Sequence, residues 1–181
     1  MKKIFTAILL ILSMTVTSTA VCAKDVEDGR QEDFTSVQVD TDTFDLRTPC
    51  GVTEEELEAV LKHELKGMAK YYLDAEEKYG VNAVFLASVS ALESGWGRYC
   101  FRPNNIFGYG RNSFDSYAEC IDFVASKISK NYLSEDGRYY SGTTIDAVNC
   151  YYNGREVWAE TVKSIFERML EKVDLSRQEN I

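Results

Sequence analysis

The chain has 181 residues and a formal net charge of −9, with 29 acidic against 20 basic residues. This length provides for one ordinary domain with short flanking segments. An acidic balance of this size disfavours binding to nucleic acid or to anionic lipid, so we expect neither as a partner.

Residues 1–23 have the pattern of a secretory signal peptide. Two lysines precede an apolar run over residues 4–16, and Val21-Cys22-Ala23 follows as a small-residue cleavage site. The apolar run is too short to span a bilayer. Cys22 raises the alternative of a lipid anchor, although Thr19-Ala20-Val21 before it makes a poor lipidation signal. We expect a secreted protein that is free of the membrane after cleavage.

Residues 24–48 are rich in aspartate and glutamate and contain few apolar residues. Such a composition cannot bury a core, so we expect a disordered acidic leader there. A folded domain is expected at residues 49–175, followed by a tail at residues 176–181.

Four cysteines remain after the expected cleavage. In an exported chain they predict two disulfides, with three pairings open. Their wide spacing and the single histidine, His63, argue against a metal site, and we expect no cofactor. The four are Cys50, Cys100, Cys120 and Cys150.

Helical periodicity begins at Thr53. A capping box, Thr53-Glu54-Glu55-Glu56, predicts a first helix to about Leu65. An apolar stripe over residues 68–79 predicts a second helix that ends at Gly80. Asn82 then caps a third helix, which is almost wholly apolar and ends at Gly95 and Gly97.

Residues 98–115 read as an irregular loop. Ser116-Tyr117-Ala118-Glu119 is a second capping box that predicts a helix to about Tyr132, and a short helix is expected at Thr144–Asn149. A last helix over about 155–173 is expected to bury Val157, Trp158, Val162, Ile165, Phe166, Met169 and Leu170. No segment shows sustained strand alternation. We therefore predict an all-α fold, α+β at most through a vestigial hairpin.

Glu93 closes the apolar third helix and is the best candidate for chemistry. Desolvation by the core and the negative end of the helix dipole both raise the pKa of a carboxyl group in this position. A carboxyl that keeps its proton near neutral pH can protonate a leaving oxygen in glycoside hydrolysis. Trp96, between Gly95 and Gly97, offers an indole face suited to a sugar ring.

Polar and aromatic residues beyond the third helix are candidate ligand contacts. Asn104 and Asn105 either form a turn or present their amides to sugar hydroxyls, and residue chemistry alone leaves both open. Tyr109, Tyr151 and Tyr152 lie in stretches that read as loops, where ligand contact is plausible.

The segments 79–86, 91–97 and 104–110 resemble glycoside hydrolase family 73, as do Phe114-Asp115-Ser116-Tyr117 and the spacing from Tyr152 to Trp158. The resemblance covers about residues 53–172. It implies a lysozyme-like α fold and a peptidoglycan endo-β-N-acetylglucosaminidase, or autolysin, that is extracellular or associated with the cell wall. Glu93 matches the family's catalytic acid and Tyr152 an active-site tyrosine, while Asn105, Phe107 and Gly108 match a turn lining the groove.

The resemblance fails at the second carboxylate. Many family members carry it on a mobile hairpin after the Phe-Gly turn, but here only residues 110–113 intervene before the next predicted helix. Glu119 is expected to act as a helix cap, and Asp115 is either a cap residue or a candidate second acid. Without a second acid, the substrate's 2-acetamido group or Tyr152 would assist.

The leading hypothesis is a monomer that cleaves the β-1,4 bond between N-acetylglucosamine and N-acetylmuramic acid in peptidoglycan strands. Glu93 would donate the proton and Tyr152 would stabilise the oxocarbenium charge. A muramidase or lytic transglycosylase is the enzymatic alternative, although those enzymes carry a Gly-Leu-Met-Gln-like turn where this chain has residues 104–108. A non-catalytic glycan-binding or wall-assembly module is the third hypothesis.

Overall fold

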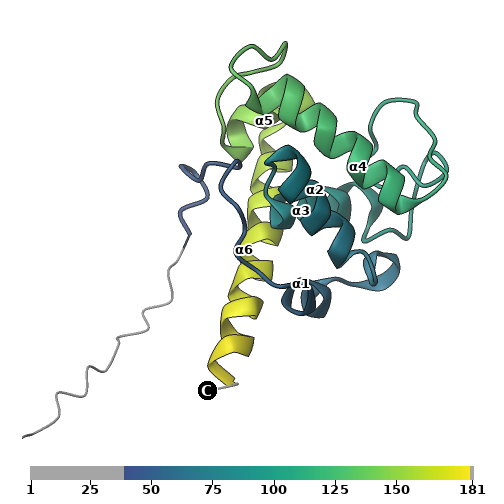
Figure 1. The fold of residues 1–181 in the computed structure, drawn as a ribbon. Coiled ribbons are helices and arrows are strands. Elements are labelled where there is room, and N and C mark those ends of the chain that lie inside the picture. Colours follow the sequence, from purple (N-terminus) through teal and green to yellow (C-terminus); the bar gives the residue numbers. More distant parts are fainter. Residues whose placement is uncertain (1–38, 180–181) are drawn as a thin grey trace, which may run out of the picture. The chain divides into compact units, whose positions relative to one another are not determined.

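The computed structural model describes residues 39–179, and the signal peptide expected at residues 1–23 lies outside them. This part of the chain is helical and contains no strand, which confirms the all-α prediction. None of its helices is long and apolar enough to cross a membrane. The helices are α1 (Glu54–Val60), α2 (Ala69–Tyr79), α3 (Ala83–Ser94), α4 (Tyr117–Ile128), α5 (Ile145–Tyr152) and α6 (Glu156–Glu179), with a 3₁₀ turn at His63–Leu65 and a π-helical turn at Ser129–Leu133 (Figure 1).

The first helix is shorter than expected. Its capping box forms as predicted, because the Thr53 hydroxyl accepts the Glu56 N–H at 3.2 Å and the Glu56 carboxylate accepts the Thr53 N–H at 2.8 Å. α1 then stops at Val60, since Leu61 takes an extended backbone conformation with ψ 151°. This turn of the chain buries the Leu61 side chain, so tertiary packing ends the helix before Leu65.

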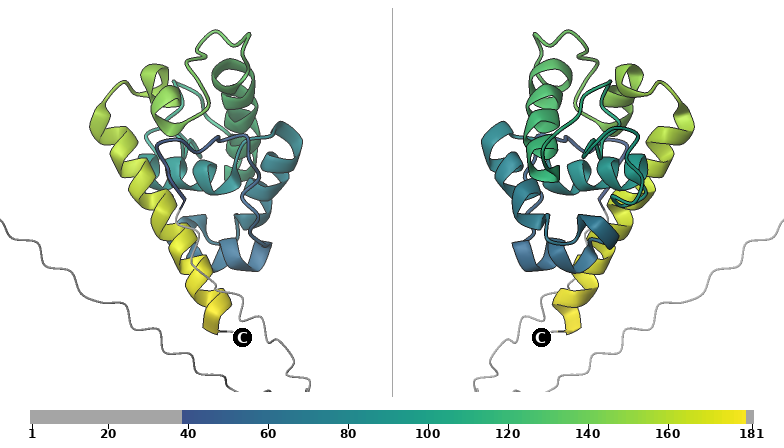
Figure 2. Two further views of the ribbon diagram at one scale, coloured as in Figure 1. Left: turned by 90° about the vertical axis from the view of Figure 1, so that its left-hand side faces the viewer. Right: turned by 90° about the vertical axis from the view of Figure 1, so that its right-hand side faces the viewer.

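α3 is the central helix, and its two ends form as the sequence predicts. The Asn82 side chain accepts the Phe85 N–H, and Gly95 ends the helix in the left-handed region with φ 56°. Every residue from 81 to 91 is buried. Such a helix needs neighbours on all sides, and α2 and α6 pack directly against it (Figure 2).

α6 is the longest helix and passes α5, α3 and α1 in turn (Figure 1). It continues to Glu179, beyond the end expected near residue 173. Its buried stripe includes Trp158, Ile165 and Met169 as predicted. The expected burial of Val157 is wrong: this side chain is 68% exposed, because it lies about 100° around the helix from Trp158.

Residues 39–48 pack on the domain, so the disorder expected over 24–48 does not extend to them. Leu46 is fully buried, donates its N–H to the Thr143 carbonyl at 2.9 Å, and accepts the Asn82 N–H at 2.9 Å. Lys163 of α6 pairs with Asp42 at 2.6 Å. The Thr41 hydroxyl also donates to Glu167 at 2.7 Å, and the Phe44 ring packs on Phe166 with centroids 5.5 Å apart. Buried side chains and polar contacts with α6 thus anchor an otherwise acidic segment.

The expectation of two disulfides is not met. All four cysteines among the described residues are free thiols. Cys50 lies beside the Glu76 carboxylate, and burial raises the pKa of its thiol to about 11. Burial likewise raises the pKa of Cys120 to about 12, while Cys150 is exposed on α5. Packing and hydrogen bonds, and no disulfide among the described residues, therefore hold the loops near Glu93.

Candidate active site

Glu93 is the penultimate residue of α3, and its carboxyl group is half-buried. Its Oε1 accepts a hydrogen bond from the indole Nε1 of Trp158 at 2.7 Å. Burial raises the pKa of Glu93, and the bond from the Trp158 indole opposes that shift in part. The carboxyl group is therefore biased toward its protonated form, as a proton donor requires.

Gly108 brings the loop backbone against the other oxygen of Glu93. A Cβ atom placed on Gly108 would lie 3.2 Å from Glu93 Oε2, and the backbone there has φ +59°. No hydrogen-bond donor from the described residues reaches Oε2. Glycine at 108 thus keeps a side chain out of the space beside Oε2, the carboxyl oxygen that has no hydrogen-bond donor among the described residues.

Asn104 and Asn105 hold this loop in shape. The Asn105 amide donates to the Tyr109 and Asn112 carbonyls at 3.2 and 3.1 Å and accepts the Tyr109 N–H at 2.9 Å. The Asn104 amide donates to the Phe114 carbonyl at 2.9 Å. Since Asn105 is also buried, this geometry favours the turn-forming role over direct contact with a sugar.

Tyr152 is connected to Glu93 through Trp158, which contacts both residues. It is the last residue of α5, a helix that runs three residues beyond its expected end. Its ring packs on Trp158 with centroids 5.1 Å apart, and its hydroxyl donates to the Phe107 carbonyl at 3.1 Å. Burial first, and then the charge of Glu93, raise the pKa of Tyr152, so it remains a neutral phenol.

A row of aromatic rings extends from this point. Tyr152 contacts Tyr132 at 5.9 Å and Tyr109 at 6.3 Å between centroids. Tyr151 is 59% exposed and packs against Tyr139 at 5.8 Å. Both Tyr151 and Tyr152 belong to α5, so the expectation that they lie in a loop is wrong. Aromatic faces next to a carboxyl group suit a sugar ring.

Trp158 and Gly108 complete the surroundings of Glu93. The sequence did not predict that either residue contacts Glu93 directly. The spacing from Tyr152 to Trp158 points to the active site, but the apolar stripe of α6 equally predicts that Trp158 is a residue of the hydrophobic core. The direction of its indole N–H depends on how α6 crosses α3. Phe107, by contrast, is a core side chain that offers only its carbonyl.

Three other candidates lie apart from Glu93. Trp96 lines a pocket with residues of α1 and α6, and neither Glu93 nor Trp158 lines that pocket. Asp115 is exposed, and its N–H donates to the Glu119 carboxylate at 2.7 Å. Glu119 therefore caps the start of α4, as expected, although it reaches Asp115 and not Ser116.

Within residues 39–179, no cluster of three or more histidine, cysteine, aspartate or glutamate side chains has the arrangement of a metal site. Glu93 is thus the one candidate acid that the described structure places among aromatic rings and in a half-buried position.

Comparison with known proteins gives a family and a fold. A family model described as mannosyl-glycoprotein endo-beta-N-acetylglucosaminidase matches residues 69–171. Two Streptococcus pneumoniae proteins, from strains TIGR4 and R6, carry the name "Putative endo-beta-N-acetylglucosaminidase". Each is 29% identical in an alignment 146 residues long, and the match covers 71% of this chain. The match spans only 22% and 21% of those relatives' own length.

Solved structures of S. aureus Autolysin E have a similar fold. A catalytic mutant in complex with the disaccharide NAG-NAM aligns with a TM-score of 0.60 and 19% identity, over 75% of this chain and 74% of that one. A complex with the muropeptide NAM-L-Ala-D-iGlu aligns with a TM-score of 0.59 and 21% identity, over 74% and 73%. The likeness confirms the lysozyme-like helical fold.

Proposed function

The chain belongs to the glucosaminidase family of glycoside hydrolases, and we propose that it is a secreted peptidoglycan hydrolase. It cleaves the β-1,4 bond between N-acetylglucosamine and N-acetylmuramic acid. The observation that carries the proposal is the half-buried Glu93 carboxyl group, whose Oε1 is held by the Trp158 indole while Gly108 leaves room beside Oε2.

Glu93 acts as the general acid. Burial raises the pKa of Glu93, which favours the protonated carboxyl group, and Oε2 is the oxygen with room for a ligand atom. The proton passes from Oε2 to the glycosidic oxygen as the bond to the anomeric carbon breaks. The indole bond to Oε1 stabilises the carboxylate that this step produces.

Tyr152 faces the positive charge that develops on the sugar ring. Its O–H is directed at the Phe107 carbonyl, so the lone pairs of its oxygen remain to face the oxocarbenium-like transition state. Its packing on Trp158 fixes this orientation relative to Glu93. Tyr152 therefore supports the transition state electrostatically and transfers no proton.

A second carboxylate has no clear position in the described structure. Asp115 and Glu119 are exposed at the start of α4, and no contact joins either of them to Glu93. The substrate's own 2-acetamido group is the nucleophile that this geometry favours, and water then opens the resulting ring with Glu93 as base.

The relatives support peptidoglycan as the substrate. Autolysin E, which has this fold, was solved in complex with NAG-NAM and with a muropeptide. A substrate in the wall agrees with the signal peptide predicted at residues 1–23 and with a monomer that acts outside the cell.

Product analysis tests the proposal. Purified peptidoglycan is digested and the new ends are reduced with borohydride; we expect reduced N-acetylglucosamine. Reduced muramic acid would identify a muramidase, and a 1,6-anhydro end would identify a lytic transglycosylase. We expect Glu93→Gln to lower the rate at least about 100-fold, because it removes the proton donor and keeps the side-chain volume. Equal activity of the two proteins would overturn the role of Glu93.

A further inference from the structure

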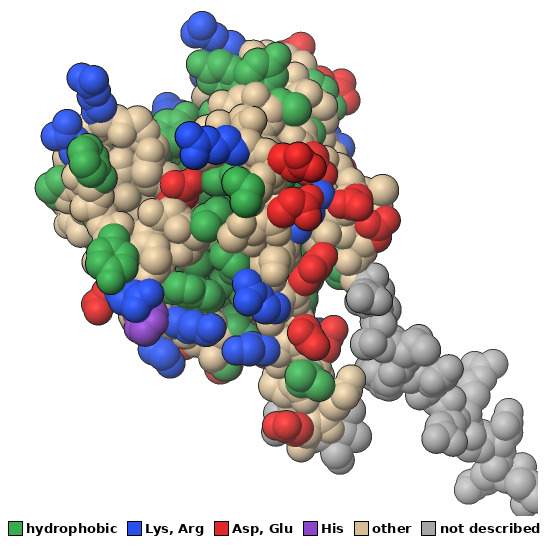
Figure 3. All heavy atoms as spheres, turned by 180° about the vertical axis from the view of Figure 1, so that it is seen from behind, with side chains coloured by type: hydrophobic (Ala, Val, Ile, Leu, Met, Phe, Trp, Pro, Cys, Tyr) green, Lys and Arg blue, Asp and Glu red, His purple; other side chains and the backbone are tan. Residues whose placement is uncertain are grey.

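The pocket that contains Trp96 joins an apolar floor to a positively charged rim. We call it the basic pocket. Its apolar residues come from α1, α6 and the turn after α3, and no acidic side chain lines it. Figure 3 shows one face of the molecule, on which Lys and Arg side chains border apolar ones and acidic side chains gather mainly to one side. The lining residues are Val60, Lys62, Trp96, Ile165, Arg168, Met169 and Lys172.

The three cations of the basic pocket have no acidic partner among the described residues. The Lys62 ammonium lies over the Trp96 ring, 4.9 Å from its centroid. The Nε of Arg168 donates a hydrogen bond to the Ser164 carbonyl of the same helix at 2.8 Å. Two other cations of α6, Lys163 and Arg177, are each paired with carboxylates at 2.6 Å. Three cations without a carboxylate partner line one apolar pocket of a chain with net charge −9, and this local positive charge favours an external anion.

α6 connects this pocket to Glu93. Trp158, which binds Glu93, and Ile165, which lines the pocket, are seven residues apart and so lie on the same face of the helix. The separation along the axis is about 10 Å from Trp158 to Ile165 and about 21 Å to Lys172, at about 1.5 Å per residue. An extended peptide of three to five residues spans about 10–17 Å. A peptide attached to the sugar beside Glu93 can therefore reach the near side of the pocket at Ile165. The Lys172 side chain, which leans toward the N-terminus of α6, covers the remaining distance.

We propose that the basic pocket binds the acidic stem peptide of the substrate strand, an inference that rests on the proposed function. The apolar floor receives the alanine methyl groups, and Lys62, Arg168 and Lys172 bind the carboxylates. Binding there positions the muramic acid that carries the peptide relative to Glu93. Peptide-bearing strands are then preferred to strands stripped of peptides.

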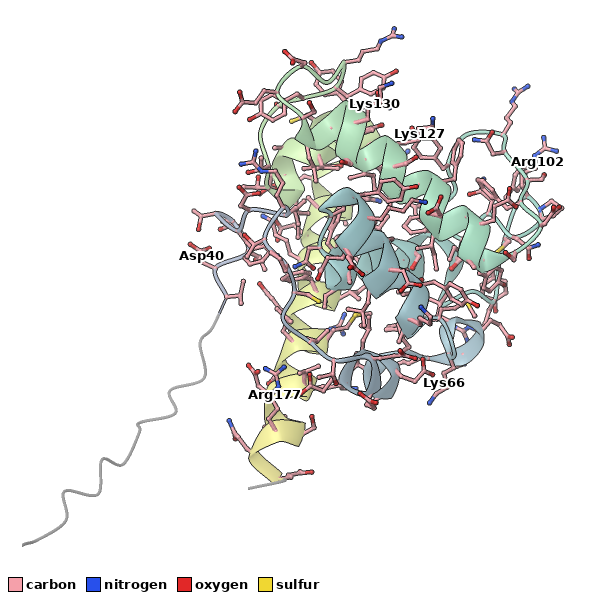
Figure 4. All side chains as sticks on the ribbon, viewed as in Figure 1. Asp40, Lys66, Arg102, Lys127, Lys130 and Arg177 are labelled. Atoms are coloured by element: carbon pink, nitrogen blue, oxygen red, sulfur yellow. The ribbon has the colours of Figure 1, made fainter. Side chains whose placement is uncertain are left out.

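The test compares two double variants with the same change of charge. The first variant, Lys62→Gln/Lys172→Gln, alters the pocket. The second, Lys127→Gln/Lys130→Gln, alters two lysines on α4 and the turn after it. Figure 4 shows that these two lysines lie far from Lys66 and Arg177, which are close in sequence to the two pocket lysines. Both lysines of the pocket pair are exposed, so the fold should tolerate their replacement. Each protein is assayed on intact peptidoglycan and on strands from which an amidase has removed the peptides.

We expect the pocket variant to lose about tenfold in kcat/KM on intact peptidoglycan, mostly through KM, since two exposed ion pairs contribute about 0.7 kcal/mol each. Its activity on stripped strands should equal that of the wild type, and the control variant should be unchanged on both substrates. An equal loss on both substrates, or no loss on either, would overturn the proposal.

A binding measurement keeps this test separate from the proposed function. A muramyl peptide with free carboxylates and its amidated form are titrated against Glu93→Gln protein, with and without the pocket substitutions. Carboxylate-dependent binding that the pocket substitutions weaken about tenfold supports the inference even if no hydrolysis is seen. Absence of such binding overturns it, as does pocket-dependent binding to phosphatidylglycerol vesicles with none to the peptide.

Discussion

Glu93 and Glu56 are both partly buried glutamates at helix ends, yet their surroundings have opposite effects on the proton. Glu56, in the first turn of α1, binds Arg177 through Nε at 2.6 Å and Nη2 at 2.8 Å, and it also accepts the Thr53 N–H. These donors lower its pKa to about 2. Glu93, at the last turn of α3, has one neutral donor, and burial raises its pKa.

The difference shows that the number and the charge of the hydrogen-bond donors, together with burial, decide whether the pKa of a glutamate is lowered or raised. A cation and several donors keep Glu56 ionised at neutral pH, and its ion pair ties the last turns of α6, where Arg177 lies, to α1 (Figure 4). A single indole N–H orients Glu93 without fixing its charge. The first arrangement stabilises the fold, and the second allows proton transfer.

Among the substitutions that test this difference between Glu93 and Glu56, Gly108→Ala should lower activity most, because it closes the space beside Glu93 Oε2. The added Cβ would lie 3.2 Å from that oxygen, so the loop must shift or the leaving oxygen is excluded. We expect a fall in kcat of about 10- to 100-fold, the scale on which general acid catalysis depends on position. Hydrolysis of purified peptidoglycan measures it.

Gly110→Ala is the matched control, because Gly110 has φ +60° in the same loop and its Cβ would meet nothing nearer than 3.6 Å. Both substitutions carry the same left-handed strain of about 1 kcal/mol. If the two variants lose the same activity, strain in the loop explains the loss and the space beside Glu93 does not.

Trp158→Phe should make Glu93 still less like Glu56, because it removes the only hydrogen-bond donor that the described residues provide to Glu93. The indole favours the ionised carboxylate, so its loss raises the pKa of Glu93 further. The high-pH limb of kcat/KM should therefore move to higher pH, while loss of orientation lowers the rate about tenfold. A pH–rate profile measures both, and a limb that stays in place or moves to lower pH would contradict this assignment.

Glu56→Gln should have the smallest effect and change stability without activity. We expect the free energy of unfolding at neutral pH to fall by about 1 kcal/mol, a value reduced for the partial exposure of the pair. The folded pKa is lowered, so this contribution is complete above the ordinary pKa of 4.5 and is lost as pH falls toward about 2.

Urea unfolding of Glu56→Gln at pH 7 and at pH 3 measures this loss. Glu55→Gln is the control, since Glu55 is an exposed residue of the same first turn with no ion pair in the described structure. An equal destabilisation of both variants would assign the effect to helix charge in general and not to the Arg177 contact.

Local signals predicted the elements that carry Glu93. Asn82 and Gly95 bound α3 at the predicted residues because a side-chain cap and a left-handed glycine act within a few residues of the helix they delimit. Ser116 opens α4 for the same reason. The predicted end of α1 was less accurate, since the burial of Leu61 and not a local stop signal sets it. α5 runs on to the left-handed Gly154, whose N–H bonds back to the Asn149 carbonyl.

The sequence by itself determined the all-α class, the central apolar helix and the place of a single carboxyl group at its end. Only the tertiary structure showed that the Trp158 indole binds Glu93, that Gly108 approaches its free oxygen, and that Leu46 packs on the domain. It also showed four free cysteines where two disulfides were expected. These features depend on how residues distant in the chain meet, and hydrophobic burial, which drives that meeting, is non-directional and leaves no fixed spacing in the sequence.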